Sequence, residues 1–413
     1  MKYKETQIGK VPTHWNVLPI KEIAEVVTDY VANGSFASLA KNVVYKDEED
    51  FAVLIRLVDY NNDFRGKFVF IDEHAYEFLS KSKLYGNEII ISNVGANVGT
   101  VFRCPKLRYK MSLAPNSVMV KFKGNDDFYF HWLRGYNGQQ MLKSIVTGSA
   151  QPKFNKTNFK EMVVPVPPIG EQNKIASILN SIEEKIKLNK QINENLEQQA
   201  QGYFQKLFVD NANPEWTTGT ISDLGTVVGG STPSKAKPEY YTETGIAWIT
   251  PKDLSINKSK FVSHGENDIT ELGLKNSSAT IMPEGTVLFS SRAPIGYIAI
   301  AAGEVTTNQG FKSVVPKSEV GTPFVYFFLK NTLPLIEGMA SGSTFKEVSG
   351  STMKNVPAVI PDAETLAKFS DFCTPIFAQQ CILEGQNQSL ATLRDNLLPK
   401  LMSGELNVDN INL

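Results

Sequence analysis

The stretch VPVPPIGEQNKIASIL, residues 164–179, decides the fold, because a β-like apolar run is followed by a proline string and the start of a helix. Pro165, Pro167 and Pro168 are expected where the strand ends, since proline cannot donate to a strand ladder and does not disturb a helix that begins after it. Residues 358–373, AVIPDAETLAKFSDFC, have the same layout 194 positions later. The chain is therefore expected to build this junction twice.

The two halves of the chain agree at this offset, without a gap, over about sixty residues. Gly148 corresponds to Gly342, and Leu207 to Leu401. Upstream the offset drifts by a few residues, as surface insertions would cause, and the run EIIISNVGANVG at 88–99 corresponds to GTVLFSSRAPIG at 285–296. Such a duplication predicts a mixed α/β (α+β) fold with a pseudo-twofold internal repeat, in which each globular unit is followed by one long helix.

Both long helices carry a heptad seam. Its residues recur at alternating steps of four and three, the spacing of a coiled-coil contact stripe. Asn189, with Asn193 and Asn387, is expected to fix the register of the seam. The predicted seam consists of Ile175, Leu179, Ile182, Ile186, Asn193 and Leu196 in the first helix and Phe369, Ile376, Leu383, Asn387, Leu390 and Leu397 in the second.

Chain order predicts the direction of the two helices. The first leads from the first globular unit to the second, and the second leaves the second unit, so a paired arrangement is an antiparallel coiled coil with the units at opposite ends. A helix from Gly170 to Phe208 would be about 58 Å long at 1.5 Å per residue. The predicted segments are 1–168 (first globular domain with its lead-in), 169–210 (first helix), 211–361 (second globular domain) and 362–413 (second helix and tail).

Composition indicates a globular protein, with 42% hydrophobic and 21% charged residues. We expect no membrane segment, because no apolar run approaches the length of a bilayer and the N-terminus lacks a signal-peptide core. The three cysteines form no pairwise framework, which favours a reducing, cytoplasmic location.

Charge is distributed unevenly along the chain. Between Ser80 and Lys160 there are thirteen Lys or Arg residues against three acidic residues, an excess of +10 in a chain of net charge −1. An excess of this size is typical of a nucleic-acid footprint, although a solvated lysine-rich face is the alternative. Residues 216–360 hold twelve basic and twelve acidic residues, so charge favours nucleic-acid binding by the first half only.

Motifs for catalysis are missing from the sequence. There is no phosphate-cradling GxxxxGK[ST] run and no G-x-S-x-G elbow, and the four histidines pair with no cysteine at metal-ligand spacing. We therefore predict no catalytic residues and no metal site. Two alternatives remain open: a standalone DNA methyltransferase or endonuclease with an unrecognised active site, and a scaffold without a nucleic-acid role.

Polar loops between short apolar strands are the candidate DNA contacts, because Asn, Gln, Ser, Thr, Lys and Arg are the side chains that read base edges and hold phosphates. Arg292 is the preferred base-reading residue, although any single one of these residues could be an ordinary turn former. The candidates are Ser92, Asn93, Asn97, Lys110, Asn116, Gln151 and Lys153 in the first half and Thr232, Ser234, Lys235, Ser290, Ser291, Arg292, Asn308, Gln309, Lys312 and Lys346 in the second.

The chain resembles the specificity (S) subunit of type I restriction–modification enzymes. The resemblance is carried by the lead-in IGKVPTHWNVLPIKEI at 8–23, by the junction VPVPPIGEQNKIASIL with its long helix, and by the repetition of both. The second junction, PDAETLAKF, departs from the pattern because it lacks the Glu-Gln pair of the first.

The resemblance implies a non-catalytic subunit that reads double-stranded DNA. Each globular unit would be a target-recognition domain, and the antiparallel helices would set the distance between the two halves of a bipartite target. Two modification (methyltransferase) subunits would bind to the chain, and restriction (translocase-nuclease) subunits would join them. The subunit itself would need no cofactor, since S-adenosylmethionine, ATP and Mg²⁺ would bind to these partners.

Overall fold

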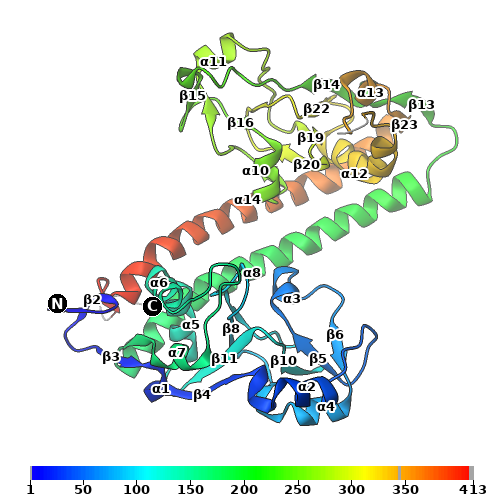
Figure 1. Cartoon of the computed structure of the whole chain (residues 1–413). Helices are drawn as coiled ribbons and strands as arrows, with labels where there is room; N and C mark the ends of the chain where they lie inside the picture. Colours follow the sequence, from blue (N-terminus) through cyan, green and yellow to red (C-terminus); the bar gives the residue numbers. More distant parts are fainter. Residues whose placement is uncertain (1, 343–345, 409–413) are drawn as a thin grey trace. The chain divides into compact units, whose positions relative to one another are not determined.

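The computed structural model describes residues 2–342 and 346–408, which divide into two compact units (Figure 1). Unit 1 comprises Met1–Glu184 with Leu390–Leu413, and unit 2 comprises Lys185–Ser389. Each unit therefore includes part of both long helices, α8 (Ile169–Gln205) and α14 (Ala363–Met402). Residues 343–345, next to Lys346, and residues 409–413 of the predicted C-terminal segment lie outside the described residues.

Unit 1 is built on two four-stranded sheets. One has the order β6-β5-β10-β7 and includes the parallel pair β5·β10, while the other, of order β4-β11-β8-β9, is antiparallel throughout. The strands are β4 (Ala24–Asp29), β5 (Ala52–Ile55), β6 (Val69–Ile71), β7 (Lys83–Leu84), β8 (Ile89–Ser92), β9 (Val101–Arg103), β10 (Lys110–Leu113) and β11 (Ser117–Phe122).

Short strand pairs and helices complete unit 1. The pairs are β1 (Tyr3–Thr6) with β2 (Gly9–Pro12) and β3 (Asn16–Pro19) with β12 (Val163–Val166). The helices are α1 (Ile20–Ile23), α2 (Phe36–Asn42), α3 (Leu57–Asn61), α4 (Glu73–Phe78), α5 (Asp126–Arg134), α6 (Tyr136–Ser144) and α7 (Lys156–Glu161), with 3₁₀ turns η1 (Tyr30–Asn33) and η2 (Ser80–Ser82).

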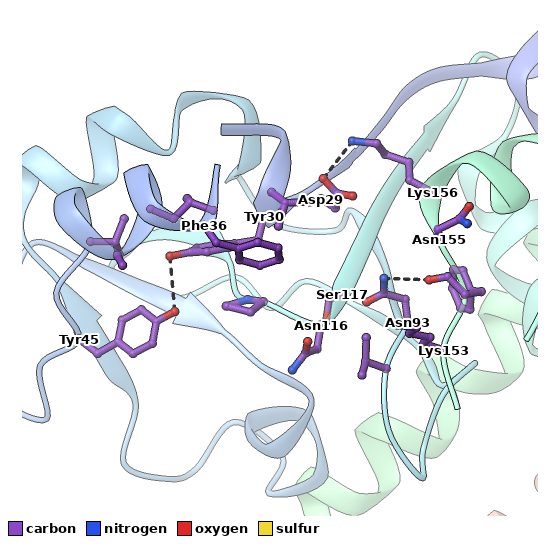
Figure 2. Close-up of a pocket in the computed structure, with 17 residues that line it drawn as sticks. Asp29, Tyr30, Phe36, Tyr45, Asn93, Asn116, Ser117, Lys153, Asn155 and Lys156 are labelled. Carbon is purple, nitrogen blue, oxygen red and sulfur yellow. Dashed lines mark hydrogen bonds and ion pairs between the residues drawn. The ribbon is translucent and has the colours of Figure 1, made fainter. Parts of the chain in front are cut away.

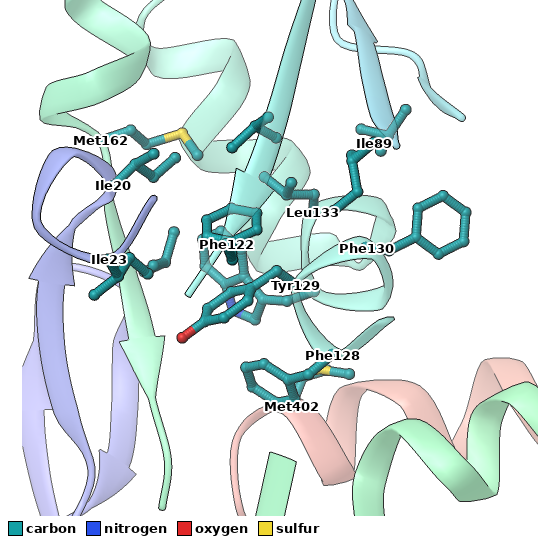
Figure 3. Close-up of a cluster of buried hydrophobic side chains, with 14 of the residues drawn as sticks. Ile20, Ile23, Ile89, Phe122, Phe128, Tyr129, Phe130, Leu133, Met162 and Met402 are labelled. Atoms are coloured by element: carbon teal, nitrogen blue, oxygen red, sulfur yellow. The ribbon is translucent and has the colours of Figure 1, made fainter. Parts of the chain in front are cut away.

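Strand β8 is apolar on both faces because it is covered on both. Successive side chains of a strand point to opposite sides. Ile89 and Ile91 belong to the cluster that includes Phe128 and Leu133 of α5, and Figure 3 draws Ile89 with these two α5 residues. Ile90 instead packs with residues of the other sheet. The β-like run at 89–91 therefore encodes a buried central strand.

Unit 2 repeats this topology. Its five-stranded sheet has the order β14-β22-β19-β20-β17, which contains the counterpart of β4-β11-β8-β9, and its parallel pair β16·β21 corresponds to β5·β10. The strands are β13 (Thr217–Thr220), β14 (Gly225–Gly229), β15 (Tyr241–Thr242), β16 (Trp248–Ile249), β17 (Phe261–Val262), β18 (Asp268–Ile269), β19 (Val287–Ser291), β20 (Ile295–Ala301), β21 (Thr306–Thr307), β22 (Lys312–Pro316) and β23 (Pro357–Ile360).

The helices of unit 2 follow the same order along the chain. Helix α12, rich in aromatic residues, takes the place of α5, and the pair β13·β23 takes the place of β3·β12. The predicted internal repeat is confirmed by this correspondence. The remaining helices are α9 (Ile221–Leu224), α10 (Pro251–Ile256), α11 (Glu271–Lys275), α12 (Thr322–Gly338) and α13 (Gly350–Lys354), with the turns η3 (Lys206–Asp210) and η4 (Pro238–Tyr240).

The strand–proline–helix junction differs from the prediction in one detail. Pro165 lies inside β12, opposite Val17, so only Pro167 and Pro168 follow the strand. The two-stranded pair tolerates Pro165 because a residue at a sheet edge need not donate to a ladder.

The first residues of α8 explain the Glu-Gln motif. The Trp15 indole donates to Glu171 Oε2 (2.8 Å), the Asn125 N–H donates to Gln172 Oε1 (3.0 Å), and Gln172 Nε2 donates to the Pro167 carbonyl (2.8 Å). Together these contacts tie the lead-in and the proline string to the start of the helix.

Helices α8 and α14 run antiparallel where they pair within unit 2. Asn189 Nδ2 donates to Gln386 Oε1 (3.3 Å), and Asn193 Nδ2 donates to the Gln380 carbonyl (3.4 Å), so residue numbers fall along one helix as they rise along the other. The polar partners of the two asparagines are therefore glutamine groups and not other asparagines. Among the described residues, the Oδ1 atoms of Asn189, Asn193 and Asn387 are buried without a hydrogen-bond partner.

The predicted seam residues differ in burial along the two helices. Within unit 1, residues of α8 and the end of α14 share one apolar cluster. Leu366 and Phe377 of α14, which the prediction left out, are also buried, and Phe377 packs against Phe327 of α12 (ring centroids 5.8 Å apart). Of the predicted residues, Ile175, Leu179, Ile182, Phe369 and Leu383 are buried, and Ile186, Asn193, Leu196, Ile376, Asn387, Leu390 and Leu397 are half-buried.

A buried ionic cluster attaches the rest of unit 2 to both long helices. Lys260 Nζ contacts Glu197 of α8 (2.8 Å) and Gln380 of α14 (2.9 Å), and Lys330 of α12 contacts the same glutamate (2.6 Å). Burial opposes ionisation of Glu197, but the two lysines outweigh it and hold the carboxyl pKa below its ordinary value. Burial lowers the pKa of Lys260 to about 8, against the pull of Glu197.

The cluster predicts a large cost for removing its carboxylate. Glu197→Gln leaves the buried ammonium of Lys260 without its counter-ion, and we expect the free energy of unfolding to fall by about 3–5 kcal/mol. Denaturant unfolding of the full chain measures it. The control is Glu364→Gln, which breaks an exposed ion pair with Lys368 (2.6 Å) and should cost less than about 1 kcal/mol. Equal losses in both variants would contradict a structural role for the cluster.

Candidate nucleic-acid interface

Three loops of unit 1 meet at the carboxyl end of β8 and are joined by backbone hydrogen bonds. The Asn93 N–H donates to the Asn116 carbonyl (3.0 Å), the Phe154 N–H donates to the Asn93 carbonyl (3.1 Å), and the Gly95 N–H donates to the Pro152 carbonyl (2.9 Å). We call this arrangement, formed by residues 93–99, 114–117 and 147–154, the three-loop junction of unit 1. These three bonds join main-chain atoms, so they do not depend on which side chains project from the loops.

Unit 2 contains the same junction, formed by residues 291–296, 308–311 and the described part of 341–348. The Ser291 N–H donates to the Gly310 carbonyl (2.7 Å), and the Val348 N–H donates to the Ser291 carbonyl (3.0 Å). Ser341 and Glu347 exchange backbone hydrogen bonds, as Thr147 and Lys153 do 194 positions earlier. Glu347 therefore occupies the position of Lys153.

The two junctions show that the predicted alignment of residues 88–99 with 285–296 is wrong by one residue at its centre. Asn93 corresponds to Ser291, and not to Ser290 as the alignment of residues 88–99 with 285–296 implied. Gly99 and Gly296, both with positive φ (91° and 96°), still match, because the loop between is one residue longer in unit 1. It follows that Val94 and Arg292 occupy equivalent positions.

Side chains of the unit 1 junction line a cavity of about 640 Å³ (Figure 2). Three predicted residues, Asn93, Asn116 and Lys153, lie here together. Asn116 has a φ of 66°, in the left-handed region that asparagine tolerates better than most residues. The Asn93 amide is engaged internally, since its Nδ2 donates to the Phe154 carbonyl (3.2 Å).

Sequence reasoning missed the aromatic wall of this cavity. Tyr30, Tyr45 and Phe36 line it, and Phe36 is 80% exposed. Lys156 lies at the same cavity but is paired with Asp29 (2.9 Å). The polar run NGSFASLAKN at 33–42, which contains Phe36, was recognisable as a candidate loop, but only polar and charged side chains were selected as contacts, so the aromatic ones were passed over.

Side chains of the unit 2 junction line a different cavity, of about 690 Å³. Arg292 and Lys346, both predicted, lie here with Glu347, which was not. Arg292 Nη1 is 3.4 Å from a Glu347 carboxylate oxygen, and Lys312 Nζ is 3.7 Å from the other. The offset of 194 could have identified Glu347, because it aligns with Lys153, which was predicted.

Several predicted contacts are placed where DNA cannot reach their side chains. Ser92, Ser290 and Ser291 are buried. The Ser290 hydroxyl donates to the Pro294 carbonyl (2.8 Å) and accepts from the Tyr297 N–H (2.8 Å), while the Ser291 hydroxyl donates to the Gly310 carbonyl (3.1 Å). These geometries argue that the serines shape the loops and do not contact DNA.

The other predicted residues are dispersed. Lys110 lies over the ring of Phe51 (4.5 Å) and lines neither cavity. Asn308 accepts a hydrogen bond from the Gly310 N–H (2.9 Å), and Thr232 is hydrogen bonded to Gln309. Asn97, Gln151, Ser234 and Lys235 are exposed in loops.

The folded unit neutralises part of the basic segment 80–160. Six of its cations form ion pairs, and five of the acidic partners come from outside the segment. The pairs are Lys83–Glu77, Arg103–Asp127, Arg108–Glu49, Lys121–Glu25, Arg134–Glu183 and Lys156–Asp29. The charge excess of the segment therefore overstates the free positive charge of the surface.

Over residues 2–342 and 346–408, no group of three or more His, Cys, Asp or Glu residues could hold a metal ion. Within the same ranges, no helix has the length and apolar character that crossing a membrane requires.

Comparison with known proteins identifies the family. A family model described as "Type I restriction modification DNA specificity domain" matches residues 12–198 and again residues 213–393. The chain belongs to this family. It is a specificity subunit of a type I restriction–modification system with two target-recognition domains, one for each copy of the repeat.

Individual relatives carry the same description. The MjaIX specificity subunit of Methanocaldococcus jannaschii is 41% identical over 169 residues, which is 40% of this chain and 39% of that subunit. The HindI specificity subunit of Haemophilus influenzae is 23% identical over 72% of this chain and 80% of its own length. The relatives are named as specificity subunits, so this chain is the specificity component and not the standalone methyltransferase or endonuclease considered as an alternative.

A solved structure supports the fold. The S subunit of the type I system from M. genitalium aligns over 95% of this chain and 96% of its own length, with a TM-score of 0.59 and 16% sequence identity. The mixed fold with two domains and long helices predicted from the sequence is confirmed.

The hydrogen bonds of Ser290 predict a stability cost that an exposed serine does not have. Ser290→Ala leaves the N–H of the half-buried Tyr297 in β20 without its acceptor, and we expect the free energy of unfolding to fall by about 1–3 kcal/mol. The control is Ser255→Ala, which removes an exposed hydroxyl bonded to the Lys252 carbonyl. Thermal unfolding of both variants checks the difference, and an unchanged midpoint for Ser290→Ala would show that the loop does not depend on this hydroxyl.

Proposed function

We propose that this specificity subunit reads a bipartite target in double-stranded DNA, with one half-site at each three-loop junction. The observation that supports this proposal is that both domains present different side chains on the same hydrogen-bonded backbone. Lys153 projects in unit 1 at the position of Glu347 in unit 2, and Val94 in unit 1 stands at the position of Arg292. Polar and charged side chains read base edges and hold phosphates, so two junctions with the same backbone but different side chains would read two different sequences.

We propose that the chain acts as the adaptor of a larger complex. Two modification (methyltransferase) subunits would bind it, and restriction (translocase-nuclease) subunits would join them in the cytoplasm. S-adenosylmethionine, ATP and Mg²⁺ would be held by those partners. Co-purification of the chain with a modification subunit, followed by sequencing of the methylated positions, tests this function. A methylation pattern without two separated half-sites would overturn it.

Lys153 is expected to contribute to affinity and not to specificity. Its side chain is exposed at the unit 1 junction, and a lysine that neutralises a phosphate releases counterions. We expect Lys153→Ala to weaken binding to all duplex sequences and to reduce the salt-dependence slope by about 1. The control is Lys190→Ala, which removes an exposed lysine from α8. Titration of labelled duplexes at several salt concentrations measures both, and a change at one base position only would contradict the assignment.

We expect the two long helices to set the unread gap between the half-sites. Removing one heptad from each of α8 and α14 preserves the phase of the seam while shortening both helices by about 10 Å, at 1.5 Å per residue. The half-site sequences should stay the same, and the number of unread base pairs should decrease. Mapping methylated sites for the shortened chain measures the gap. The spacer role would be refuted if the gap stayed constant in a complex that still methylates DNA.

A further inference from the structure

Arg292 and Glu347 form a half-exposed ion pair on the three-loop junction of unit 2. The guanidinium and carboxylate are 3.4 Å apart, and their side chains are 37% and 38% exposed. Both line the cavity of about 690 Å³. Lys312 approaches the same carboxylate (3.7 Å) but is itself mostly covered, with 15% of its side chain exposed. Lys346 and Glu337 also line this cavity, and within it the Arg292–Glu347 pair places a donor fork directly beside an acceptor.

The ion pair is not what holds the loops together. Ser291 and Gly310 are joined through the backbone, Val348 donates to the Ser291 carbonyl, and Glu347 exchanges backbone hydrogen bonds with Ser341. An exposed ion pair adds at most a small stabilisation to such a frame. A carboxylate at a surface that meets DNA is also repelled by phosphates. Glu347 therefore needs a compensating donor on the DNA.

A G·C base pair supplies the complementary pattern. In the major groove guanine presents the acceptors O6 and N7, and cytosine presents the donor N4–H. O6 and N4 are hydrogen bonded to each other, so they lie about 2.9 Å apart. This spacing is close to the separation of the Arg292 and Glu347 head groups. We propose, on the basis of the proposed DNA-reading function, that Arg292 and Glu347 together read one G·C pair in the second half-site.

The geometry favours G·C over a T·A pair. Thymine O4 and adenine N6 also place an acceptor beside a donor, but thymine offers the guanidinium a single acceptor next to its methyl group. Arginine forms two parallel hydrogen bonds with guanine, so the second bond is lost on thymine. The paired carboxylate fixes which strand carries the guanine, because it must face the cytosine amino group.

Unit 1 cannot use the same readout. Val94 occupies the position of Arg292, and Lys153 occupies the position of Glu347, as the backbone hydrogen bonds of the two junctions establish. Valine offers no donor and lysine no acceptor. The readout by this pair is therefore confined to the second half-site, and the first half-site serves as an internal reference in every experiment.

The test maps methylated sites for the full chain in complex with a modification subunit. The wild-type complex first gives the bipartite motif. We expect Arg292→Ala and Glu347→Ala each to relax the same single G·C position of the second half-site, with the preference reduced about tenfold to a hundredfold. Arg292→Lys keeps the charge but not the fork and should also weaken the preference. Lys275→Ala, which removes an exposed cation of unit 2 paired with Glu271 (3.3 Å), is the control and should leave the motif unchanged.

A charge swap separates base reading from a structural ion pair. Arg292→Glu with Glu347→Arg retains the pair, so thermal unfolding should be unchanged while the G·C preference is lost. An unchanged motif in the swapped chain, or relaxed positions that differ between the two single variants, would overturn the paired readout. These outcomes leave the proposed function intact. That function fails separately, if the wild-type complex yields no bipartite motif.

Discussion

The hydrogen bond between a tryptophan indole and a carboxylate at the start of each long helix is the contact on which the remaining structure depends. Trp15 donates to Glu171, and Trp216 donates to Asp362, each at 2.8 Å. Glu171 lies in the first turn of α8 and Asp362 directly precedes α14, and a carboxylate at either place also satisfies the partial positive charge of the helix N-terminus. The bond ties the lead-in of a domain to the residue where its helix begins. Because the helix start is fixed, the seam residues that follow have a defined phase relative to the domain.

This constraint explains how the halves could diverge without losing the fold. Within each unit, the sheet, the helix start and the loop junction are held by backbone bonds and buried apolar contacts, as with Ile89 and Phe128 in unit 1. The side chains of Lys153 and Glu347, which project from the junctions, carry none of these contacts. Val94 in one domain and Arg292 in the other occupy equivalent positions, as do Lys153 and Glu347, so the two domains present different chemistry. The backbone hydrogen bonds of residues 93 and 291 are nevertheless the same.

The sequence predicted the features that depend on local periodicity. The heptad seam was readable because an apolar residue such as Leu179 or Phe369 recurs with the period of a helix, and burial follows from that period. The gapless part of the repeat identified equivalent residues correctly, as the matching bridges at Lys153 and Glu347 show. Anchoring the alignment at Gly99 produced the one-residue error upstream, because a loop of different length separates that glycine from strand β8.

The exposure of the candidate DNA contacts and the pairing of their charges could not be predicted, because both depend on which side chains the tertiary fold turns inward. Ser290 and Ser291 sit at the end of a strand, where polar residues are often exposed, yet packing of the junction covers both. Charge along the sequence misled in a similar way, since Arg134 and Glu183 are distant in sequence but paired in the fold (2.7 Å). The net charge of a segment includes every cation in it, even one that pairs in the fold with an acidic residue from another segment.

An acidic residue at the candidate DNA surface is the least expected feature, and it clarifies how specificity differs from affinity. A lysine such as Lys153 attracts every phosphate and so favours all sequences equally. Glu347 is repelled by phosphates and becomes favourable only when a base donates to it. A carboxylate therefore lowers affinity for wrong sequences more than for the right one, which is how specificity arises from repulsion. Lys153 and Glu347 hold matching bridges in the two domains, so under the proposed function equivalent positions would serve opposite strategies.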